Sequence, residues 1–426
     1  MDTRDWHSKF AIPTNFLVRP LRFIDLRVES MPIPTPFHPR TSKLCTSLKW
    51  TDWAGYYSVC LYTIPNDSEY YAIRHSAALM DITPLYKYEI NGIDSGRFVS
   101  RIMARNVEKM KVGQVFYSCW CDDFGKVIDD GTVFRLEENR FQVNAGEPML
   151  AWFSSFIRGF DVTIEDITDR IAALSIQGPT SRDILKQISD IDFDSLSYFQ
   201  GTRGKLDDLN VYVSRTGYTG DLGYEIWVQN RDALRLWDAL MSAGMPYLLR
   251  PAGLDALDIA RIEAGLILTG VDFHNANHCL AQSRKSTPYE LGLGWTVDLD
   301  RQPFCGQRAL EAEREAGSRY ALVGLELDWE EIEALYEKHG LPAQVSGAAW
   351  RYGVPVYNRG ARQIGKATSG VWSPMAKKNL ALASVEAQYA QPGTELRIEH
   401  TVEYQREKVT AMVAKMPFYN PDHKKA

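Results

Sequence analysis

Long apolar runs, paired cysteines and an excess of positive charge are all lacking in this 426-residue sequence. No run reaches the roughly 18 apolar residues that a membrane-spanning helix needs. The first 20 residues carry charges and prolines where a signal peptide would have an unbroken apolar stretch. Secretion and membrane spanning are therefore disfavoured, and we expect a cytoplasmic protein.

The charge balance argues against nucleic-acid partners. The formal net charge is −6, whereas nonspecific binding to DNA or RNA needs a broad electropositive surface. A local basic groove for an anionic ligand stays compatible with this balance. We therefore expect small-molecule chemistry and no nucleic-acid partner.

The six cysteines have neither the spacing of a disulfide framework nor that of a paired CxxC zinc site. This usage fits a reducing compartment. Cys119 and Cys121 stand two apart in a strand-like run, so they share one face, where core packing is the simpler role. His274, His278 and Cys279 have helix-like spacing, but no nearby carboxylate pattern completes a ligand set. We expect no metal site.

Against these absences stands an ordinary globular composition. Apolar residues make up 45% of the chain and charged residues 24%, which favours a folded protein over a disordered or fibrous one. The length suits two or three packed modules of about 100 to 200 residues each. Residues 1–44 include the proline-studded segment 31–36, and we predict that they form an extended arm.

Strand and helix patterns follow this arm without a strict βαβ rhythm, which favours an α+β fold. An antiparallel meander is predicted over 113–144, and a small β-barrel over 320–419, where strands alternate with Gly and Pro turns. The predicted helices are 70–80, 149–160, 180–188, 232–243 and 254–264, and the further predicted strands are 86–90, 172–177 and 210–215.

The sharpest chemical signal is the segment 122–131, where a tight turn delivers Asp129 and Asp130 to the start of a strand. Side chains alternate along a strand, so only one of the two faces a given pocket. If Asp130 points inward together with Ile128 and Thr132, a partly desolvated carboxylate there would suit proton handling or the stabilisation of a developing cation. Turn chemistry alone also explains Asp and Gly at these positions, as solvated caps.

A second signal is the glycine-rich loop 214–227 between two strands. Its three glycines would let the backbone come close to a flat ligand. Glu225, in an aromatic setting beside Tyr224 and Trp227, could accept two hydrogen bonds from an aminopyrimidine edge, because an ionised carboxylate is an acceptor only. The segment lacks the lysine of a phosphate loop. The simpler alternative is a hairpin with a half-buried glutamate.

Both segments stand in the order and context of the folate-binding glycine-cleavage T-protein family, which this chain resembles from about Lys49 to Tyr419. Further blocks agree with that resemblance, and their joint order is more specific than any one of them. They are Met80–Leu85, Val115–Ser118, Gln142–Ala145, Ile176–Pro179, Arg215–Gly220, Arg261–Gly265, Gly292–Trp295, Phe304–Leu310 and Thr368–Pro374.

The resemblance implies a three-domain cloverleaf with tetrahydrofolate in a central hole. It implies domains at 45–165 and 166–285, intertwined and folate-binding, and a third at 286–426 that contains the barrel. Asp130 matches the family's catalytic aspartate and Glu225 the residue that recognises the pterin. The remaining cofactor-binding residues expected on this basis are Tyr117, Asn144, Tyr218 and Trp372.

Several positions depart from the family member that serves glycine cleavage. Leu257 replaces a cationic residue of the folate site, so ionic pairing with the cofactor's carboxylate tail is in doubt. The blocks at 80–87 and 269–272 look like those of relatives that demethylate small compounds. The aromatic residues would suit a cage for an onium donor, although such rings more often fill interiors. They are Trp50, Trp53, Tyr56, Tyr57, Trp120, Trp295 and Trp372.

The resulting hypothesis is a tetrahydrofolate-dependent one-carbon transferase that demethylates a small methylated amine, onium or ether. Three alternatives stay open. One is an aminomethyltransferase that uses a lipoylated carrier protein. Another is a noncatalytic folate-binding relative, whose hallmark motif is absent at 264–272. The third is a folate module beside a separate oxidase, because no GxGxxG dinucleotide motif occurs in this chain.

Overall fold

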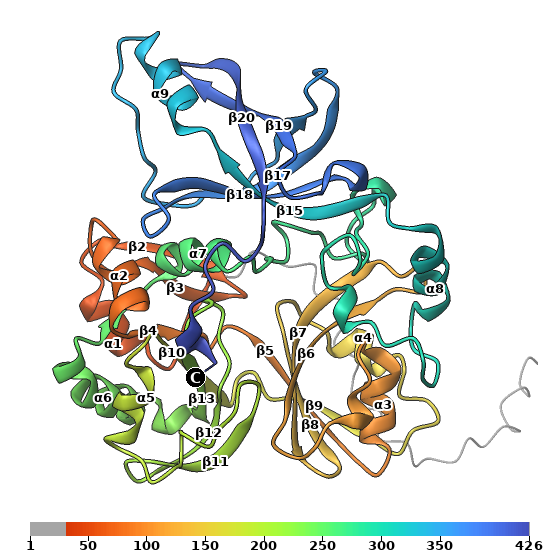
Figure 1. Cartoon of the computed structure of the whole chain (residues 1–426). Helices are drawn as coiled ribbons and strands as arrows, with labels where there is room; N and C mark the ends of the chain where they lie inside the picture. Colours follow the sequence, from red (N-terminus) through yellow and green to blue (C-terminus); the bar gives the residue numbers. More distant parts are fainter. Residues whose placement is uncertain (1–30, 426) are drawn as a thin grey trace, which may run out of the picture.

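Three β-sheets and a closed barrel form the framework of residues 31–425, the part of the chain that this computed structural model describes. Two larger sheets lie side by side, and the barrel lies across the end that they share (Figure 1). The α-helices join and cover these sheets. They are α1 (His38–Leu44), α2 (Asp67–His75), α3 (Ser95–Ile102), α4 (Leu150–Ser154), α5 (Ser181–Lys186), α6 (Ala233–Gly244), α7 (Leu254–Glu263), α8 (Gln307–Ala316) and α9 (Trp329–Glu337).

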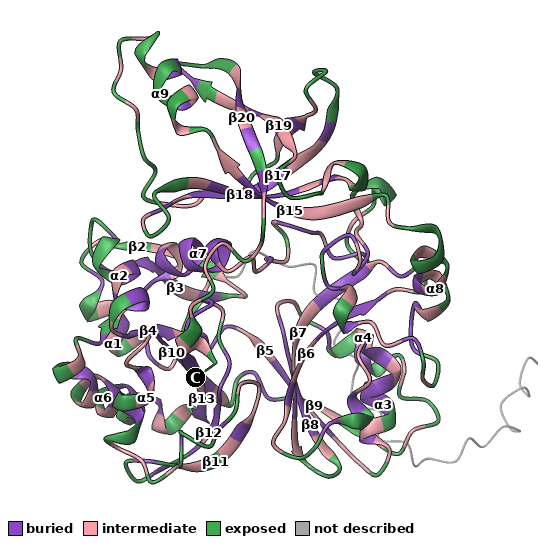
Figure 2. Cartoon of the chain, in the orientation of Figure 1, coloured by how far each residue is buried: buried purple, intermediate pink, exposed green. Residues whose placement is uncertain are grey.

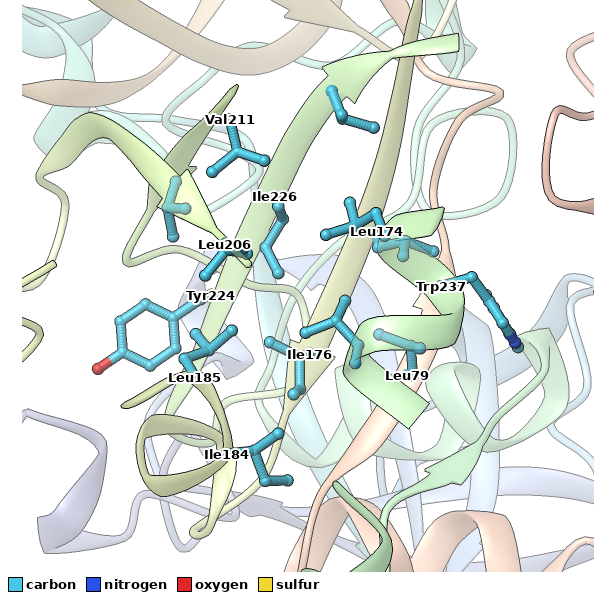
Figure 3. Close-up of a cluster of buried hydrophobic side chains, with 14 of the residues drawn as sticks. Leu79, Leu174, Ile176, Ile184, Leu185, Leu206, Val211, Tyr224, Ile226 and Trp237 are labelled. Carbon is cyan, nitrogen blue, oxygen red and sulfur yellow. The ribbon is translucent and has the colours of Figure 1, made fainter. Parts of the chain in front are cut away.

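A six-stranded sheet carries the glycine-rich loop. Its strands in spatial order are β11 (Gly201–Leu206), β12 (Leu209–Ser214), β13 (Gly223–Gln229), β10 (Ile171–Gln177), β4 (Ala78–Asp81) and β14 (Arg250–Pro251). Alternate side chains of these strands pack on α5 and α6, around Ile176, Ile226 and Trp237 (Figure 3). Burying such apolar faces is the main force that holds sheet and helices together. The loop between β12 and β13 is therefore held on a rigid base.

A five-stranded antiparallel sheet carries the aspartate pair. Its spatial order is β6 (Val115–Cys121), β7 (Val127–Glu137), β8 (Arg140–Ala145), β5 (Tyr86–Asn91) and β9 (Thr163–Asp166). A bulge lies between Trp120 and Cys121, where β6 pairs with the start of β7. Bulges bend a strand and re-aim its side chains. This one precedes Asp129 directly.

The small sheet β1 (Ile33–Pro34), β3 (Tyr56–Leu61) and β2 (Lys49–Trp53) packs with α2 and α7. Helix α7 contacts α2 and β3 as well as strands of the barrel, and it is buried along most of its length (Figure 2). A helix that is buried all round links the layers that it touches. In this way α7 ties the first half of the chain to the barrel.

The barrel closes through six antiparallel strands: β15 (Tyr320–Leu327), β18 (Lys378–Glu386), β17 (Gln363–Ser373), β16 (Val354–Tyr357), β19 (Glu395–Val402) and β20 (Gln405–Ala414). Small and branched side chains fill its interior. After β20 the chain returns to the end of α7, where the Tyr419 N–H donates to the carbonyl of Glu263. The C-terminal end lies beside the six-stranded sheet (Figure 1). The predicted α+β fold with a C-terminal β-barrel is confirmed.

Two predicted helices are too long. The helix predicted over 70–80 ends at His75, with α2. Ala78–Asp81 instead forms β4, which pairs with β10 in the interior of a sheet. The prediction over 149–160 holds only as α4. Gly159 has φ +89°, outside the helical region, and the Phe160 ring turns back to within 5.5 Å of the Phe98 ring. Tertiary packing of these aromatic residues overrides the helical pattern.

Of the predicted arm, residues 1–30 lie outside the described residues. Residues 31–44 form β1, which pairs with β3, and α1, which starts at a His-Pro pair, so this part is not merely extended. The domain boundaries at 165 and 285 stay predictions. Strand β4 belongs by sequence to the first predicted domain but pairs within the six-stranded sheet, which makes the two segments share a sheet. No helix among residues 31–425 combines the length and the apolarity that crossing a membrane requires.

Candidate active site

Asp130 of β7 is half-buried, and hydroxyl groups from two other segments contact its carboxylate. The Tyr117 hydroxyl on β6 donates to Asp130 Oδ2 at 2.6 Å. Thr269 Oγ1 lies 3.2 Å from Asp130 Oδ1, across 139 residues of sequence. No Lys, Arg or His of the described residues forms an ion pair with this carboxylate. Asp130 therefore combines partial access with an environment that lacks a compensating cation.

Its neighbour Asp129 is fully buried. Asp129 accepts backbone hydrogen bonds from Gly146 and Glu147, each at 3.0 Å, and its Oδ1 lies 3.0 Å from Thr269 Oγ1. A threonine hydroxyl has a single hydrogen, so it donates to only one of the two aspartates. The contact between Thr269 and the second aspartate is favourable when the carboxyl of that aspartate carries a proton and donates it to Thr269 Oγ1. The geometry fits a pair of carboxyls that holds one proton.

The electrostatics agree with this geometry. Burial raises the pKa of Asp130 to about 6, although hydrogen bonds from Tyr117 and Thr269 act to lower it. Burial and the nearby charge of Asp130 raise the pKa of Asp129 well above its usual range. Interacting carboxyls titrate as a pair. The site thus contains a group that exchanges a proton near neutral pH, which is what general acid–base catalysis needs.

Asn144 joins this group on the adjacent strand. The sheet register pairs Tyr117 with Thr132 and Thr132 with Asn144, which places these three side chains on the face of Asp130. Asn144 Nδ2 donates to Thr132 Oγ1 at 2.9 Å, and its Oδ1 accepts from Gln142 at 2.8 Å. Because Asn144 is only 3% exposed, its evident structural role is to hold the sheet face beside Asp130.

The expected inward position of Ile128 is wrong. Ile128 is fully buried in the core cluster of Trp120 and Val133, which face away from Tyr117. The bulge between Trp120 and Cys121 shifts the alternation of side chains at this point. Asp130 and Thr132 therefore share a face without Ile128.

The segment 266–272, which brings Thr269 to the aspartates, is anchored by buried ion pairs. Arg261 of α7 contacts Asp272 at 2.6 Å and Asp258 at 2.7 Å, with both partners buried. Asp272 also accepts from the backbone N–H of Leu268 at 2.9 Å. Thr269 was not predicted as a partner of Asp130. Its only signal was the departure of block 269–272 from the family pattern.

Glu225 lies on β13, half-buried, with Thr216 Oγ1 donating to its Oε2 at 2.7 Å. Burial raises its pKa. That hydrogen bond is the only one of its side chain within residues 31–425, and no cation pairs with its carboxylate there. Its second oxygen thus keeps its hydrogen-bonding capacity, as recognition of two neighbouring N–H donors would require.

The glycines of the loop have a different role from the one expected. A Cβ at Gly217 or Gly223 would lie 2.1 or 2.2 Å from side-chain atoms of Gln177. The Gln177 amide occupies that space, donating to the Thr216 carbonyl at 3.1 Å and accepting from Thr219 at 2.9 Å. These two glycines therefore make room for a buried glutamine that shapes the loop, and not directly for a ligand.

Tyr218 links the loop to the aspartate pair. Its hydroxyl donates to the carbonyl of Ile267, two residues before Thr269. Burial is the main cause of its raised pKa, and the charge of Asp130 contributes. Tyr218 is thereby tied to the segment that brings Thr269 to Asp130. The structure brings together Tyr117, Asp130, Asn144 and Tyr218, with Glu225 on the strand that follows the Tyr218 loop.

Trp372 is not brought into this group. Ser369 and Ser373 of β17 face α7, where they contact Arg261 and Glu263. Trp372 points to the other face of the strand, and its ring lies 5.0 Å from that of Trp329. Alternation along β17 explains this separation. Its role in cofactor binding stays a prediction without a supporting contact.

The expected aromatic cage does not assemble as one unit. Trp50 and Tyr57 flank His38 in the small sheet, Trp120 is fully buried in the core of the five-stranded sheet, and Trp372 belongs to the barrel. Only Trp295 contacts the candidate site, through Tyr117. Leu257, which replaces a family cation, is 9% exposed and packs in the core around α7.

The candidate metal ligands are not gathered either. Cys119 and Cys121 are buried in one apolar cluster, as expected for packing residues. His278 Nδ1 lies 3.2 Å from Glu147, with its side chain largely exposed. Within residues 31–425, no three His, Cys, Asp or Glu side chains are arranged to hold a metal ion.

Two family profiles match this chain. Residues 46–301 match the GCVT N-terminal domain, and residues 321–420 match the glycine cleavage T-protein C-terminal barrel domain. A crystal structure of the glycine cleavage system aminomethyltransferase T from Bartonella henselae has a similar fold. It aligns with a TM-score of 0.77 and 24% identity, covering 91% of this chain and 98% of that one.

Curated relatives have two different names. An aminomethyltransferase from Alkaliphilus metalliredigens is 34% identical over 84% of this chain and 90% of its own length. A trimethylamine-oxide aldolase from Ruegeria pomeroyi is 34% identical over 91% of this chain but only 47% of its own length. The chain thus spans about half of the aldolase and nearly all of the aminomethyltransferase.

Proposed function

The chain belongs to the glycine cleavage T-protein family, a family of folate-dependent one-carbon enzymes, and from this premise we propose that it transfers a one-carbon unit from a small methylated amine, onium or ether to tetrahydrofolate. The observation that carries the proposal is Asp130, a half-buried carboxylate with a pKa of about 6 and two hydroxyl partners. No cation of residues 31–425 forms an ion pair with it. Such a group suits proton transfer at an amine nitrogen.

The residues present fit tetrahydrofolate. Glu225 keeps one carboxylate oxygen without a protein hydrogen bond within the described chain, and an aminopyrimidine edge offers two adjacent N–H donors. When bound, tetrahydrofolate supplies the amine nitrogen that accepts the one-carbon unit. Glu225 would hold the pyrimidine edge, and Tyr218 would lie between Glu225 and Asp130.

Asp130 would hold or release the proton at the accepting nitrogen. Tyr117 and Thr269 would keep its carboxylate oriented, and Asp129 would influence its charge through their coupling. An oriented carboxylate can also stabilise positive charge that develops on the transferred carbon. Tyr117 and Thr269 then act as positioning residues.

The proposed donor class rests on charge and on one relative. Asp129, Asp130 and Glu225 make the site rich in hydrogen-bond acceptors, and none of them pairs with a cation in the described part of the chain. This charge favours an amine or onium over an anionic donor. The similarity to a trimethylamine-oxide aldolase supports a methylated amine compound. Because the chain spans about half of that relative, the whole activity of the relative does not transfer with the similarity.

An aminomethyltransferase is the second candidate. It is favoured by relatives of that name that this chain covers almost from end to end, such as those from Alkaliphilus metalliredigens and Caldanaerobacter subterraneus. That reaction requires a lipoylated carrier protein as donor. A noncatalytic folate binder and a module that captures the carbon released by a separate oxidase are the remaining candidates.

Calorimetric titration with tetrahydrofolate tests the cofactor. Wild type should bind it, and Glu225→Ala should bind it about 10 to 100 times more weakly, since a buried hydrogen bond to a charged group contributes roughly 1.5 to 3 kcal/mol. Glu395→Ala is the matched variant, because that glutamate pairs with Arg359 on the barrel surface. Equal affinity of wild type and Glu225→Ala would disprove the pterin assignment.

A donor screen then separates the candidate reactions. Dimethylglycine, sarcosine, trimethylamine N-oxide and formaldehyde are each incubated with the enzyme and tetrahydrofolate, beside an aminomethylated lipoyl carrier. Without the carrier, formation of methyl-tetrahydrofolate from dimethylglycine or sarcosine supports the demethylase proposal. So does formation of methylene-tetrahydrofolate from trimethylamine N-oxide, whose N–O bond supplies the oxidising equivalents. Turnover only with the carrier supports the aminomethyltransferase, turnover only with formaldehyde supports the capture module, and folate binding without any turnover supports the noncatalytic relative.

A further inference from the structure

The loop that joins β12 to β13 contains a buried aspartate that side chains from outside the loop hold in place. Asp221 is 5% exposed. Arg74 of α2 lies 3.3 Å from its Oδ2, the Tyr419 hydroxyl donates to Oδ2 at 2.9 Å, and His423 Nε2 lies 2.7 Å from Oδ1. The two shorter contacts both come from the segment 415–425, which follows the last barrel strand. This segment therefore contributes to holding the loop.

The segment 415–425 runs from the barrel down to the six-stranded sheet (Figure 1). At the barrel, Phe418 occupies space that the missing side chain of Gly324 leaves, since a Cβ at Gly324 would lie 2.5 Å from the Phe418 ring. Beside the loop, the guanidinium carbon of Arg74 lies 4.0 Å from the centre of the Tyr419 ring. The segment is thus fixed against the barrel and against α2 before it reaches the loop.

Two other residues of the same loop belong to the candidate active site. Thr216 donates to Glu225 at 2.7 Å, and Tyr218 is tied to the segment that brings Thr269 to the aspartate pair. Only two residues separate Tyr218 from Asp221. Few backbone dihedral angles lie between them, so a displacement of one moves the other. The position of Asp221 therefore affects where Thr216 and Tyr218 lie.

Arg74 by itself holds Asp221 weakly. Its guanidinium is shared with Glu263, which it contacts at 2.6 Å, whereas its distance to Asp221 of 3.3 Å exceeds the usual length of a hydrogen bond from nitrogen. Tyr419 and His423 contact the same carboxylate at ordinary hydrogen-bond lengths. Hydrogen bonds to an ionised group are among the strong ones. The loss of either residue should therefore loosen the loop.

We propose that Tyr419 and His423 are positioning residues, which hold Asp221 and thereby keep the loop 215–222 in the form that presents Thr216 and Tyr218 to the ligand. They act on the loop and not on the aspartate pair, so ligand affinity should respond more than the chemical step. The inference rests on the proposed function for the identity of the ligand only, because the contacts with Asp221 are present without it.

Hydrogen exchange in the ligand-free protein tests the hold on the loop. Tyr419→Phe removes the hydroxyl and keeps the ring over Arg74, and His423→Ala removes the other contact. Each should speed exchange of the loop amides about tenfold, since a hydrogen bond to a charged group contributes a factor of this order. Exchange in β10 should stay unchanged. Tyr404→Phe is the matched variant, because Tyr404 is 98% exposed on the barrel.

Calorimetric titration with tetrahydrofolate tests the positioning. Tyr419→Phe and His423→Ala should each bind it about 2 to 30 times more weakly, the range for residues that act without touching the ligand. His423→Gln retains a side-chain N–H donor and should keep most of the wild-type affinity and the wild-type exchange of the loop. Thermal melting checks that every variant is folded.

Unchanged exchange of the loop in both variants would overturn the inference, and so would faster exchange with unchanged affinity. Exchange that rises in β10 as much as in the loop would indicate a general loss of stability, and would overturn it as well. If wild type bound no tetrahydrofolate, the proposed function would fail. The exchange experiment by itself would then decide whether Tyr419 and His423 hold the loop.

Discussion

Two groups of buried carboxylates differ in what neutralises them. The first lies where α7 meets α2 and the barrel. There, Glu263 pairs with Arg74 at 2.6 Å, and Asp258 and Asp272 pair with Arg261. The second is the active-site group of Asp129, Asp130 and Glu225, for which the described chain contains only hydroxyl and backbone partners.

The presence or absence of a paired arginine distinguishes structural carboxylates from those that can change their protonation. A buried ion pair fixes the charge of both partners and the position of both segments, and its disruption leaves an unpaired buried charge. A carboxylate without a cation is raised in pKa by burial and can change its protonation near neutral pH. The arginine-paired group therefore holds the domains together, and the group without cations is the one to which we assign the chemistry.

The two groups meet in the segment 266–272. Asp272 at its end is fixed by Arg261, and Thr269 within it contacts Asp129 and Asp130. The structural group thus positions a hydroxyl of the active-site group. Substitutions in one group should mainly change stability, and those in the other should mainly change turnover.

The largest effect on stability is expected from Glu263→Ala. This change leaves Asp221, at 3.3 Å, as the remaining ion-pair partner of the buried Arg74 among the described residues. It also removes the acceptor of the Tyr70 and Ser373 hydroxyls. Breaking such a pair costs about 3 to 5 kcal/mol in the free energy of unfolding. Urea unfolding followed by tryptophan fluorescence measures it, with Glu395→Ala as the exposed counterpart. Similar midpoints for the two variants would contradict the structural role.

Asp130→Asn should mainly lower turnover and leave the stability of the fold unchanged or higher. We expect kcat to fall about 100-fold or more, because general acid–base groups contribute factors of this size, while tetrahydrofolate affinity changes little. The raised pKa of Asp130 means that its folded state binds the proton more tightly than the unfolded state, so ionisation at pH 7 opposes folding. The urea midpoint of Asp130→Asn should therefore equal or exceed that of wild type. Normal turnover in this variant would refute the catalytic assignment.

The pH dependence of turnover gives a smaller effect. If the ionised Asp130 is the active form, the rate falls as pH decreases through about 6, the pKa of that group. Tyr117 and Thr269 donate hydrogen bonds that stabilise the carboxylate. Tyr117→Phe should therefore move the acid limb of the pH–rate profile to higher pH, and Thr269→Val should move it in the same direction by less.

Tyr212→Phe is the reference for these profiles, since the Tyr212 hydroxyl is buried without a hydrogen-bond partner among the described residues. Its profile should coincide with that of wild type. A shift of the acid limb to lower pH in Tyr117→Phe would show that the titrating group is not the carboxylate that Tyr117 contacts.

Local patterns predicted much of the framework. The antiparallel meander over 113–144, the strand 172–177 and the C-terminal barrel were predicted from alternation and turn residues, and the structure confirms them. Asp130 was singled out because a turn delivers it to a strand. The two helices that were predicted too long failed where Leu79 and Phe160 pack into cores that the local pattern does not show.

Thr269 and Gln177 were not predicted as parts of the site. Each acts on a partner that is distant in the sequence: Thr269 on Asp130, and Gln177 on the loop after Thr216. A single sequence shows spacing along the chain and not contacts across it. Trp372 had a suitable motif, but its face of β17 turns it toward Trp329.

The sequence by itself determined the family, the α+β fold with its barrel, and the order of the blocks that bear chemistry, because these depend on local periodicity and on shared motifs. Only the tertiary structure decided which carboxylates have an arginine and which do not. That distinction depends on packing between α7, the barrel and the two sheets. The same packing sets the burial that raises the pKa of Asp130.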